Sequence, residues 1–143
     1  MKAPVSVVIL TYNEAVNIER AIANTIAWAA EVIVLDSFST DETVAIATNA
    51  GAKVVQRKFD NYSAQRNYAI KEIELCCEWI LFLDADEYLS EALKEEITGE
   101  LANPKADGYY MKRRFYFMGK WIRWGGYYPI WLLRLFKKDK GLF

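Results

Sequence analysis

The sequence predicts an α/β protein with a doubly wound, mostly parallel sheet and helices on both of its faces. Short apolar runs rich in β-branched residues alternate with segments of helical period, and short loops join them. The clearest strand is the unbroken apolar run 79–83, whose composition is that of a strand buried on both faces. At 143 residues the chain has the length of a single domain.

The elements follow one another in regular alternation along the chain. Strands are expected at 5–10, 31–35, 53–56, 79–83, 108–117 and 131–136. Helices are expected at about 15–28, 39–50, 62–75 and 91–101. Ser39 and Glu42 have the spacing of a capping box that opens the second helix, and Gly51 is a natural stop for it. Ser90 is the expected cap of the fourth helix.

Polar residues cluster after the first, second and fourth predicted strands, at 11–14, 36–40 and 84–87. In a doubly wound sheet these loops share one edge and can face one crevice. Asp84 and Asp86 have the same sidedness in an extended chain. Two close carboxylates repel each other unless a cation or a shared proton relieves them. The pair is therefore a predicted metal site.

The chemistry of this edge suits a nucleotide diphosphate. The chain has no glycine-rich phosphate loop, which argues against a dinucleotide-binding enzyme and a P-loop NTPase. Asp36 can accept a hydrogen bond from a nucleobase imide or from ribose hydroxyls. A metal on Asp84 and Asp86 can bridge a diphosphate, and Arg66 can add a second cation. Because the sequence has no histidine, histidine bases and histidine metal ligands are excluded.

Four stretches of the chain resemble family-2 glycosyltransferases of the GT-A fold. They are 7–14, 34–43, 65–67 and 83–87, in the family's order, and the match covers about residues 4–100. The segment that begins at 107–110 is similar to the bacterial lipopolysaccharide-core β-1,4-glucosyltransferase branch. The resemblance implies a GT-A-like fold with a Rossmann-like nucleotide-binding half. It also implies an inverting transferase that moves a hexose, expected to be glucose, from a UDP-sugar to a lipopolysaccharide-core or other cell-envelope glycan, with Mg²⁺ or Mn²⁺ as cofactor.

By the same resemblance, Thr11, Asn13 and Glu14 line the nucleoside pocket and Asp36 contacts uracil. Arg66 approaches the diphosphate, and Asp86 is the principal metal ligand. The expected nucleotide-sugar-binding residues are Thr11, Asn13, Glu14, Asp36, Ser39, Arg66 and Asp84, and the expected metal ligands are Asp84 and Asp86.

The catalytic base is the residue that the sequence does not supply. Inverting transfer needs a carboxylate that deprotonates the acceptor hydroxyl, and in the family it lies well beyond the metal motif. The last segment offers only Asp107 and Asp139, and neither is well placed. We therefore expect the base beyond Phe143 and the chain to be a C-terminally truncated, donor-binding fragment.

Charge divides the chain into a donor-binding region, 1–104, and an incomplete acceptor-side segment of the same domain, 105–143. The first carries 8 basic and 17 acidic side chains, and the second carries 10 basic and 2 acidic. The second region also holds 12 of the 21 aromatic residues. Such a segment suits an anionic glycolipid acceptor and peripheral contact with an anionic membrane surface. No nucleic-acid-binding signature is present, so nucleic acid is not an expected partner.

The amino terminus lacks the pattern of a signal peptide, and no apolar run approaches the ~20 residues of a membrane span. The adjacent Cys76 and Cys77 suit neither a disulfide framework nor a zinc site. The expected location is the cytoplasm, at the inner face of the cytoplasmic membrane.

Two other functions stay open at this point. A haloacid-dehalogenase-like phosphatase also places Asp-x-Asp after a buried strand, but it requires Thr or Val where this chain has Tyr88. The other alternative is a non-catalytic nucleotide-sugar-binding module.

Overall fold

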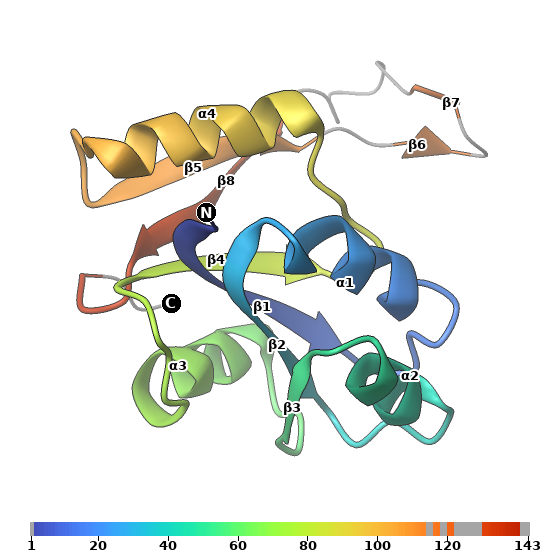
Figure 1. Cartoon of the computed structure of the whole chain (residues 1–143). Helices are drawn as coiled ribbons and strands as arrows, with labels where there is room; N and C mark the ends of the chain where they lie inside the picture. Colours follow the sequence, from blue (N-terminus) through green and yellow to red (C-terminus); the bar gives the residue numbers. More distant parts are fainter. Residues whose placement is uncertain (1, 114–115, 118–119, 122–129, 141–143) are drawn as a thin grey trace.

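A computed structural model describes residues 2–113, 116–117, 120–121 and 130–140 of the chain. The strands are β1 (Ala3–Thr11), β2 (Ala29–Asp36), β3 (Lys53–Gln56), β4 (Trp79–Asp84), β5 (Gly108–Arg113), β6 (Tyr116–Phe117), β7 (Lys120–Trp121) and β8 (Ile130–Lys137). The helices are α1 (Ile18–Ile26), α2 (Thr43–Asn49), α3 (Tyr62–Glu72) and α4 (Glu91–Ala102). Within the described residues, six strands form one sheet in the order β3-β2-β1-β4-β8-β5, and β6 pairs with β7 (Figure 1).

The sheet is mixed but mostly parallel, as predicted. β1 pairs in parallel with both β2 and β4, and β2 pairs in parallel with β3. β8 runs antiparallel to β4 and to β5. The chain moves outward from β1 through β2 to β3 and then returns to place β4 on the other side of β1. The boundary between β1 and β4 is therefore the topological switch point, where open α/β sheets bind ligands.

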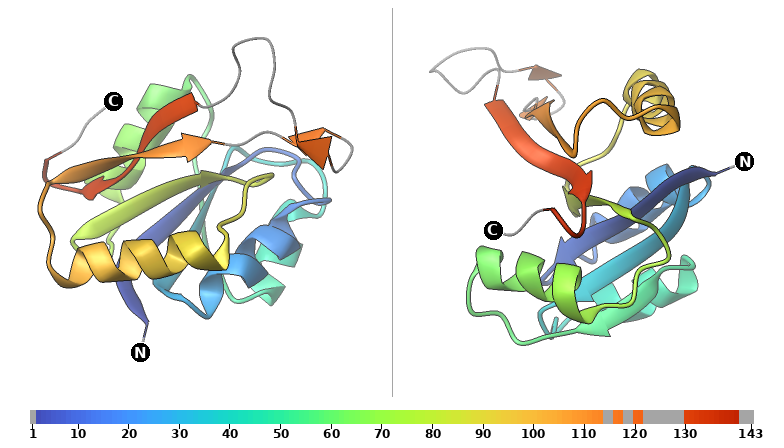
Figure 2. Two further views of the ribbon diagram at one scale, coloured as in Figure 1. Left: turned by 90° about the horizontal axis from the view of Figure 1, so that it is seen from above. Right: turned by 90° about the vertical axis from the view of Figure 1, so that its left-hand side faces the viewer.

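Helices cover both faces of the sheet, and alternate residues of β1 point to opposite faces. Val7 and Ile9 pack in one apolar cluster with Ile22 of α1 and Ile97 of α4, and this cluster also includes a residue of α2. Val8 belongs to a second cluster with residues of α3. Figure 2 shows α3 on the other side of the sheet from α4. The prediction of a doubly wound sheet is confirmed.

Two helix starts differ from the sequence prediction. α1 begins at Ile18, about three residues late, because a turn closed by the Asn17 N–H on the Glu14 carbonyl at 3.0 Å precedes it. α2 begins at Thr43, and its N-cap residue Glu42 makes no side-chain capping bond. The predicted capping box is wrong, since the Ser39 hydroxyl donates to the Asp36 carboxylate instead.

The predicted cap of α4 and the predicted stop of α2 are confirmed. Ser90 caps α4 by accepting a hydrogen bond from the Leu93 N–H at 3.1 Å. Asn61 also caps α3, where no cap was predicted, by accepting a hydrogen bond from the Ala64 N–H at 2.7 Å. Gly51 follows α2 with a φ of +98°, a conformation that favours glycine.

The basic, aromatic segment completes the main sheet. The predicted strand 108–117 is divided into β5 and β6, and residues 114–115 between them lie outside the described residues. The predicted strand 131–136 lies within β8, which is inserted between β4 and β5. In the part of the chain that the structure describes, no helix is long and apolar enough to cross a membrane.

Candidate functional site

The predicted polar clusters do meet at one edge of the sheet. Thr11, Asp36, Gln56 and Asp84 are the last residues of four parallel strands. In the strand registers Thr11 faces Asp36, Asp36 faces Gln56, and Asp84 faces the residue before Thr11. The end of β1 therefore lies between the Asp36 loop and the acidic turn that follows β4.

Asp36 is the buried centre of the first half of this edge, and its exposed fraction is 0%. Oδ1 accepts from Thr11 Oγ1 at 2.7 Å and from Ser39 Oγ at 2.5 Å. Oδ2 accepts from the Ser39 N–H at 2.8 Å and from Gln56 Nε2 at 3.2 Å. Burial raises the pKa of Asp36, but the hydrogen bonds from Ser39, Thr11 and Gln56 together outweigh burial and hold the pKa below its usual value.

Asn13 joins the loop after β1 to the loop after β2. Its N–H donates to Ser39 Oγ at 2.8 Å, and its Oδ1 accepts from the Thr40 N–H at 2.8 Å and the Asp41 N–H at 3.3 Å. The Glu14 N–H adds a bond to Thr43 Oγ1 at 2.9 Å. Three predicted binding residues, Asn13, Glu14 and Ser39, therefore hold the two loops together in this structure.

Both loops contain a residue in the left-handed region. Asn13 has a φ of +52° and Phe38 has a φ of +58°. Asparagine tolerates this conformation, whereas a phenylalanine there is strained, and such strain concentrates at functional sites. Phe38 is also 53% exposed, so burial of its ring does not offset the strain.

Exposed aromatic side chains surround the same edge. The large hydrophobic residues that are exposed in the described part of the chain are Tyr12, Val16, Phe38, Phe59, Tyr62 and Tyr88. All but Val16 are aromatic and lie in segments that follow the carboxyl ends of β1 to β4. Phe59 and Tyr62 stack edge to face with ring centroids 5.1 Å apart. Flat apolar surfaces at a polar edge suit the stacking of a planar or sugar ring.

The acidic turn is not an extension of β4. The strand ends at Asp84, and the Glu87 N–H donates to the Asp84 carbonyl at 3.0 Å to close a turn. The alternation that predicted a common side for Asp84 and Asp86 therefore stops at Asp84. Asp86 is exposed, and the side chain of Asp84 is 32% exposed.

Arg134 of β8 is one of two site residues that the sequence patterns did not reveal. Its Nη1 lies 2.9 Å from Glu87 Oε1 and its Nη2 lies 3.1 Å from Glu87 Oε2, a bidentate pair. Nη2 is also 3.8 Å from Asp84 Oδ2, and Nη1 donates to the Phe82 carbonyl at 3.3 Å. The residue is only 8% exposed. The sequence does contain a sign of this role: Arg134 is a charged residue inside the otherwise apolar run 130–136. A charge buried in a strand requires a partner.

α3 contributes Arg66 and a second residue that was missed, Gln65. Burial lowers the pKa of Arg66, and the charge of Arg134 lowers it further, while the charge of Asp84 raises it. Arg66 therefore lies within electrostatic reach of the acidic turn. Gln65 is 1% exposed; it donates to Ser37 Oγ at 3.0 Å and accepts from Arg57 Nη1 at 2.7 Å. A buried glutamine at this position ties α3 to the loop after β2.

Asp84 and Asp86 are the carboxylates of the acidic turn that could hold a divalent cation. In the described residues, no group of three or more Cys, Asp, Glu or His side chains is arranged to hold a metal. Mg²⁺ is usually bound by one or two carboxylates together with substrate phosphates and waters. Asp84 and Asp86 provide that number of carboxylates.

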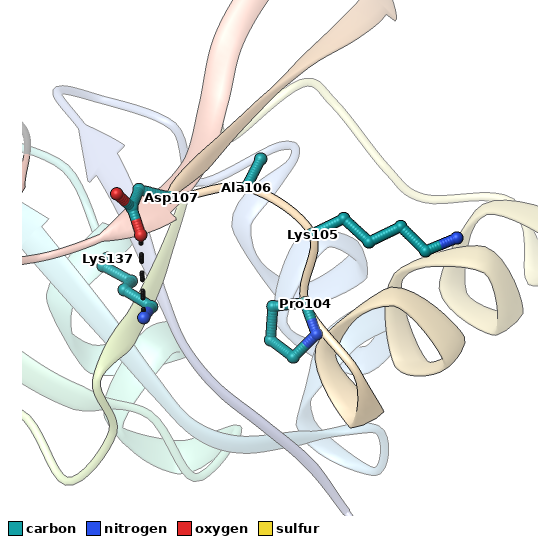
Figure 3. Close-up of a pocket in the computed structure, with 5 residues that line it drawn as sticks. All are labelled: Pro104, Lys105, Ala106, Asp107 and Lys137. Carbon is teal, nitrogen blue, oxygen red and sulfur yellow. Dashed lines mark ion pairs between the residues drawn. The ribbon is translucent and has the colours of Figure 1, made fainter.

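Asp107 lies far from this edge. It precedes β5 and is 3.6 Å from Lys137 Nζ, and Lys137 pairs in register with Trp79 at the amino end of β4. The two residues line an open hollow of about 360 Å³ with residues 104–106 (Figure 3). Asp139 is exposed and follows β8 at the same end. Neither carboxylate reaches the switch point.

The order of strands in the sheet and the helices on both of its faces place this chain in the GT-A fold class of glycosyltransferases. The chain belongs to the family described as Glycosyl transferase family 2, whose profile matches residues 6–142.

Relatives and solved structures agree with this membership. An uncharacterized glycosyltransferase of Rickettsia bellii (strain RML369-C) is 47% identical over 107 residues, which are 73% of this chain and 35% of that protein. The lipopolysaccharide core biosynthesis glycosyltransferase LpsC of Rhizobium meliloti (strain 1021) is 30% identical over 98% of this chain and 53% of its own length. The chain thus spans about a third of the first of these relatives.

Among solved structures, the mannosyltransferase PcManGT from Pyrobaculum calidifontis, in complex with GDP-Man and Mn²⁺, superposes with a TM-score of 0.62 and 25% identity. That likeness covers 79% of this chain and 36% of the other. S. aureus TarS in complex with UDP-GlcNAc has a TM-score of 0.57 and 27% identity, over 76% of this chain and 33% of that one.

Proposed function

We propose that this chain forms the donor-binding part of an inverting, metal-dependent glycosyltransferase that uses a UDP-hexose. The observation that carries the proposal is the meeting of the Thr11–Asp36 pair and the Asp84–Glu87 turn at the β1–β4 switch point. One half of this edge offers hydrogen-bonding groups for a nucleoside, and the other offers carboxylates for a cation. Family membership and the UDP-GlcNAc complex of TarS support this donor class.

Asp36 would bind the nucleobase only if a donor of the base replaced one of the protein groups that now donate hydrogen bonds to the Asp36 carboxylate. A carboxylate has about four acceptor positions, and the protein supplies a donor to each. Ser39 Oγ is the donor most easily displaced, because its hydroxyl can rotate and it already accepts from Asn13. An imide N–H of uracil would then take its place on Oδ1. Tyr12, 57% exposed in the neighbouring loop, offers a ring for stacking.

The diphosphate would lie between Arg66 and the acidic turn. Asp84 and Asp86 would hold Mg²⁺ or Mn²⁺, and the PcManGT complex with Mn²⁺ supports such a cofactor. When bound, the cation neutralises charge on the leaving diphosphate. Arg66 adds positive charge on the α3 side of the site.

The proposed acceptor is an anionic cell-envelope glycan of the lipopolysaccharide-core type, with glucose as the transferred hexose. The similarity to LpsC and the 10 basic side chains among residues 105–143 support this choice. The same charge would favour peripheral contact with the inner face of the cytoplasmic membrane, at ~1 kcal/mol for each basic residue near the surface. In this proposal the base that activates the acceptor hydroxyl lies beyond Phe143.

Family membership favours a transferase over the phosphatase alternative. A non-catalytic nucleotide-sugar-binding module shares the proposed site and differs only in lacking transfer. Metal-dependent UDP binding without sugar transfer by the longest natural form of the protein would favour that module.

A thermal-shift panel of UDP, GDP, ADP and CDP, each with and without Mn²⁺, tests the donor proposal. A ligand that binds only the native state stabilises it by ~2.7 kcal/mol when present at about 100 times its Kd. We expect the largest shift with UDP and Mn²⁺ together. Equal shifts for the four nucleotides, or a UDP shift that does not depend on Mn²⁺, would overturn it.

A further inference from the structure

The side-chain amide of Gln65 is fixed in one orientation by the arginine that faces it. Gln65 is 1% exposed, and its Oε1 accepts from Arg57 Nη1 at 2.7 Å. Because a guanidinium can only donate hydrogen bonds, the group that faces Arg57 must be the amide oxygen and not the NH₂ group. Arg57 is itself held by Asp60, whose two carboxylate oxygens lie 2.9 and 3.2 Å from Nη1 and Nη2. The position of the Gln65 NH₂ group is therefore defined as well.

The Gln65 NH₂ group in turn decides the role of the Ser37 hydroxyl. Gln65 Nε2 donates to Ser37 Oγ at 3.0 Å and to the Arg57 carbonyl at 3.5 Å. Since an amide NH₂ group only donates, Ser37 Oγ is the acceptor of this bond and keeps its own hydrogen for another partner. Among the described residues, no group accepts that hydrogen. Ser37 is partly exposed, so a bound ligand can accept it.

Ser37 directly follows Asp36, the carboxylate that we propose accepts from the nucleobase. The Ser37 N–H donates to the Thr11 carbonyl at 2.9 Å, so the chain stays beside β1 for one residue beyond β2. Consecutive residues of an extended chain point to opposite sides. The Asp36 carboxylate accordingly bonds to Thr11 of β1, and the Ser37 hydroxyl bonds to Gln65 of α3. The end of β2 therefore presents an acceptor on one side and a donor on the other.

We propose that Ser37 is a specificity-determining residue of the nucleobase pocket, where its hydroxyl donates to O4 of uracil while Asp36 accepts from the N3–H. Gln65 is the positioning residue that directs this hydroxyl. The inference rests on the proposed function, which supplies the UDP-sugar and the contact with Asp36. Uracil presents a donor at N3 and an acceptor at O4, whereas cytosine presents an acceptor at N3 and a donor at N4. The two side chains thus match uracil at both positions and cytosine at neither.

A cycle of serine variants and two nucleotides tests the contact with O4. In 4-thio-UDP a sulfur atom, which is a weak hydrogen-bond acceptor, replaces O4. Calorimetric titration in the presence of Mn²⁺ should show that the wild type binds 4-thio-UDP about fivefold more weakly than UDP, a factor typical of one net hydrogen bond. Ser37→Ala should bind UDP about fivefold more weakly than the wild type and should not distinguish the two nucleotides. Ser37→Thr keeps a hydroxyl and should retain the preference for UDP.

The positioning role of Gln65 is tested by Gln65→Glu. A carboxylate in this place can accept from Arg57 and from the Ser37 hydroxyl, whose hydrogen is then no longer available to the ligand. The variant should lose the preference for UDP over 4-thio-UDP although Ser37 is intact, an effect that a merely structural role of Gln65 would not produce. Circular dichroism checks that the variant folds, and the Ser37→Ala cycle decides the proposal if it does not. Thr48→Ala, which removes an exposed hydroxyl from α2, is the control and should leave the preference unchanged.

The outcomes separate this inference from the proposed function. If the wild type binds UDP but does not prefer it to 4-thio-UDP, the inference is overturned and the proposed UDP site stands. The same holds if Ser37→Ala or a folded Gln65→Glu variant retains the preference. If the wild type binds no UDP with or without Mn²⁺, the proposed function and the inference are overturned together.

Discussion

Thr11 and Asp36, the last residues of two neighbouring parallel strands, face each other in register and share a hydrogen bond of 2.7 Å between Oγ1 and Oδ1. The bond joins the ends of β1 and β2 at the point where their loops separate from the sheet. Since Asp36 is fully buried, its charge is stabilised by these donors and not by water.

Asp36→Asn should destabilise the fold at neutral pH. The substitution removes the charge and turns one acceptor into a donor that faces other donors, so a loss of about 1–3 kcal/mol is expected. Urea denaturation followed by circular dichroism measures it. Asp139→Asn, at an exposed position after β8, is the matched control and should change little.

The free energy of unfolding of the wild type should also depend on pH, because Asp36 titrates at different pH values in the folded and unfolded chains. Because hydrogen bonding lowers the folded-state pKa of Asp36, its contribution is fully present above the unfolded-state pKa of about 3.9. The contribution is lost as the pH falls through the folded-state pKa. Urea titrations between pH 7 and pH 3 should show a shallower acid dependence in Asp36→Asn than in the wild type; parallel curves would contradict this.

Asp86→Ala should abolish the Mn²⁺-dependent part of UDP binding and leave folding intact. Asp86 is exposed on the turn, so its removal costs little stability, whereas the proposed cation loses a principal ligand. Calorimetric titration with UDP, with and without Mn²⁺, measures the effect, and Asp139→Ala serves as the control. An unchanged affinity for UDP in the presence of Mn²⁺ would remove Asp86 from the metal site.

Asn13→Gly and Asn13→Ala should differ in a defined order. Both variants lose the hydrogen bonds that Asn13 Oδ1 accepts from the Thr40 and Asp41 N–H groups. Only alanine is also strained at a φ of +52°, where a left-handed conformation costs ordinary residues about 1–2 kcal/mol. Unfolding free energies should therefore fall in the order wild type, Gly variant, Ala variant. Equal losses would mean that the loop backbone rearranges.

Phe38→Gly should weaken donor binding without lowering stability. Glycine adopts a φ of +58° without strain, and the exposed ring of Phe38 contributes little burial. Removing the strain should offset the higher entropy of glycine in the unfolded chain, so the unfolding free energy should change by less than about 1 kcal/mol. A weaker affinity for the UDP-sugar would show that Phe38 contributes to donor binding, and an unchanged affinity would show that Phe38 has another role.

The parts of this molecule that sequence patterns predict are those set by local rules. β3 matches its predicted range 53–56, and β4 extends the predicted run 79–83 by only Asp84, because apolar runs specify buried strands directly. The meeting of three polar clusters at one edge followed from the parallel topology alone. These inferences required no knowledge of side-chain contacts.

The failures arose where side chains choose between local and distant partners. Ser39 had the spacing of a helix cap, but the buried Asp36 carboxylate needed its hydroxyl. Asp84 and Asp86 appeared equivalent only while the chain was taken as extended. Arg134 lies 47 residues after Glu87, so no local spacing connects them. Competition for a buried charge is decided by the tertiary structure, which a linear pattern does not contain.

The insertion of β8 between β4 and β5 has a consequence for the order in which the strands of the sheet pair during folding. β1 to β4 are contiguous in the sheet and can pair as the chain emerges, but the position beside β4 stays vacant until residues 130–137 have been synthesised. Closing so distant a contact is slow relative to local pairing. During that interval Glu87 of a nascent chain lacks its bidentate partner Arg134. The pair between Glu87 and Arg134 therefore forms only after β8 has paired with β4.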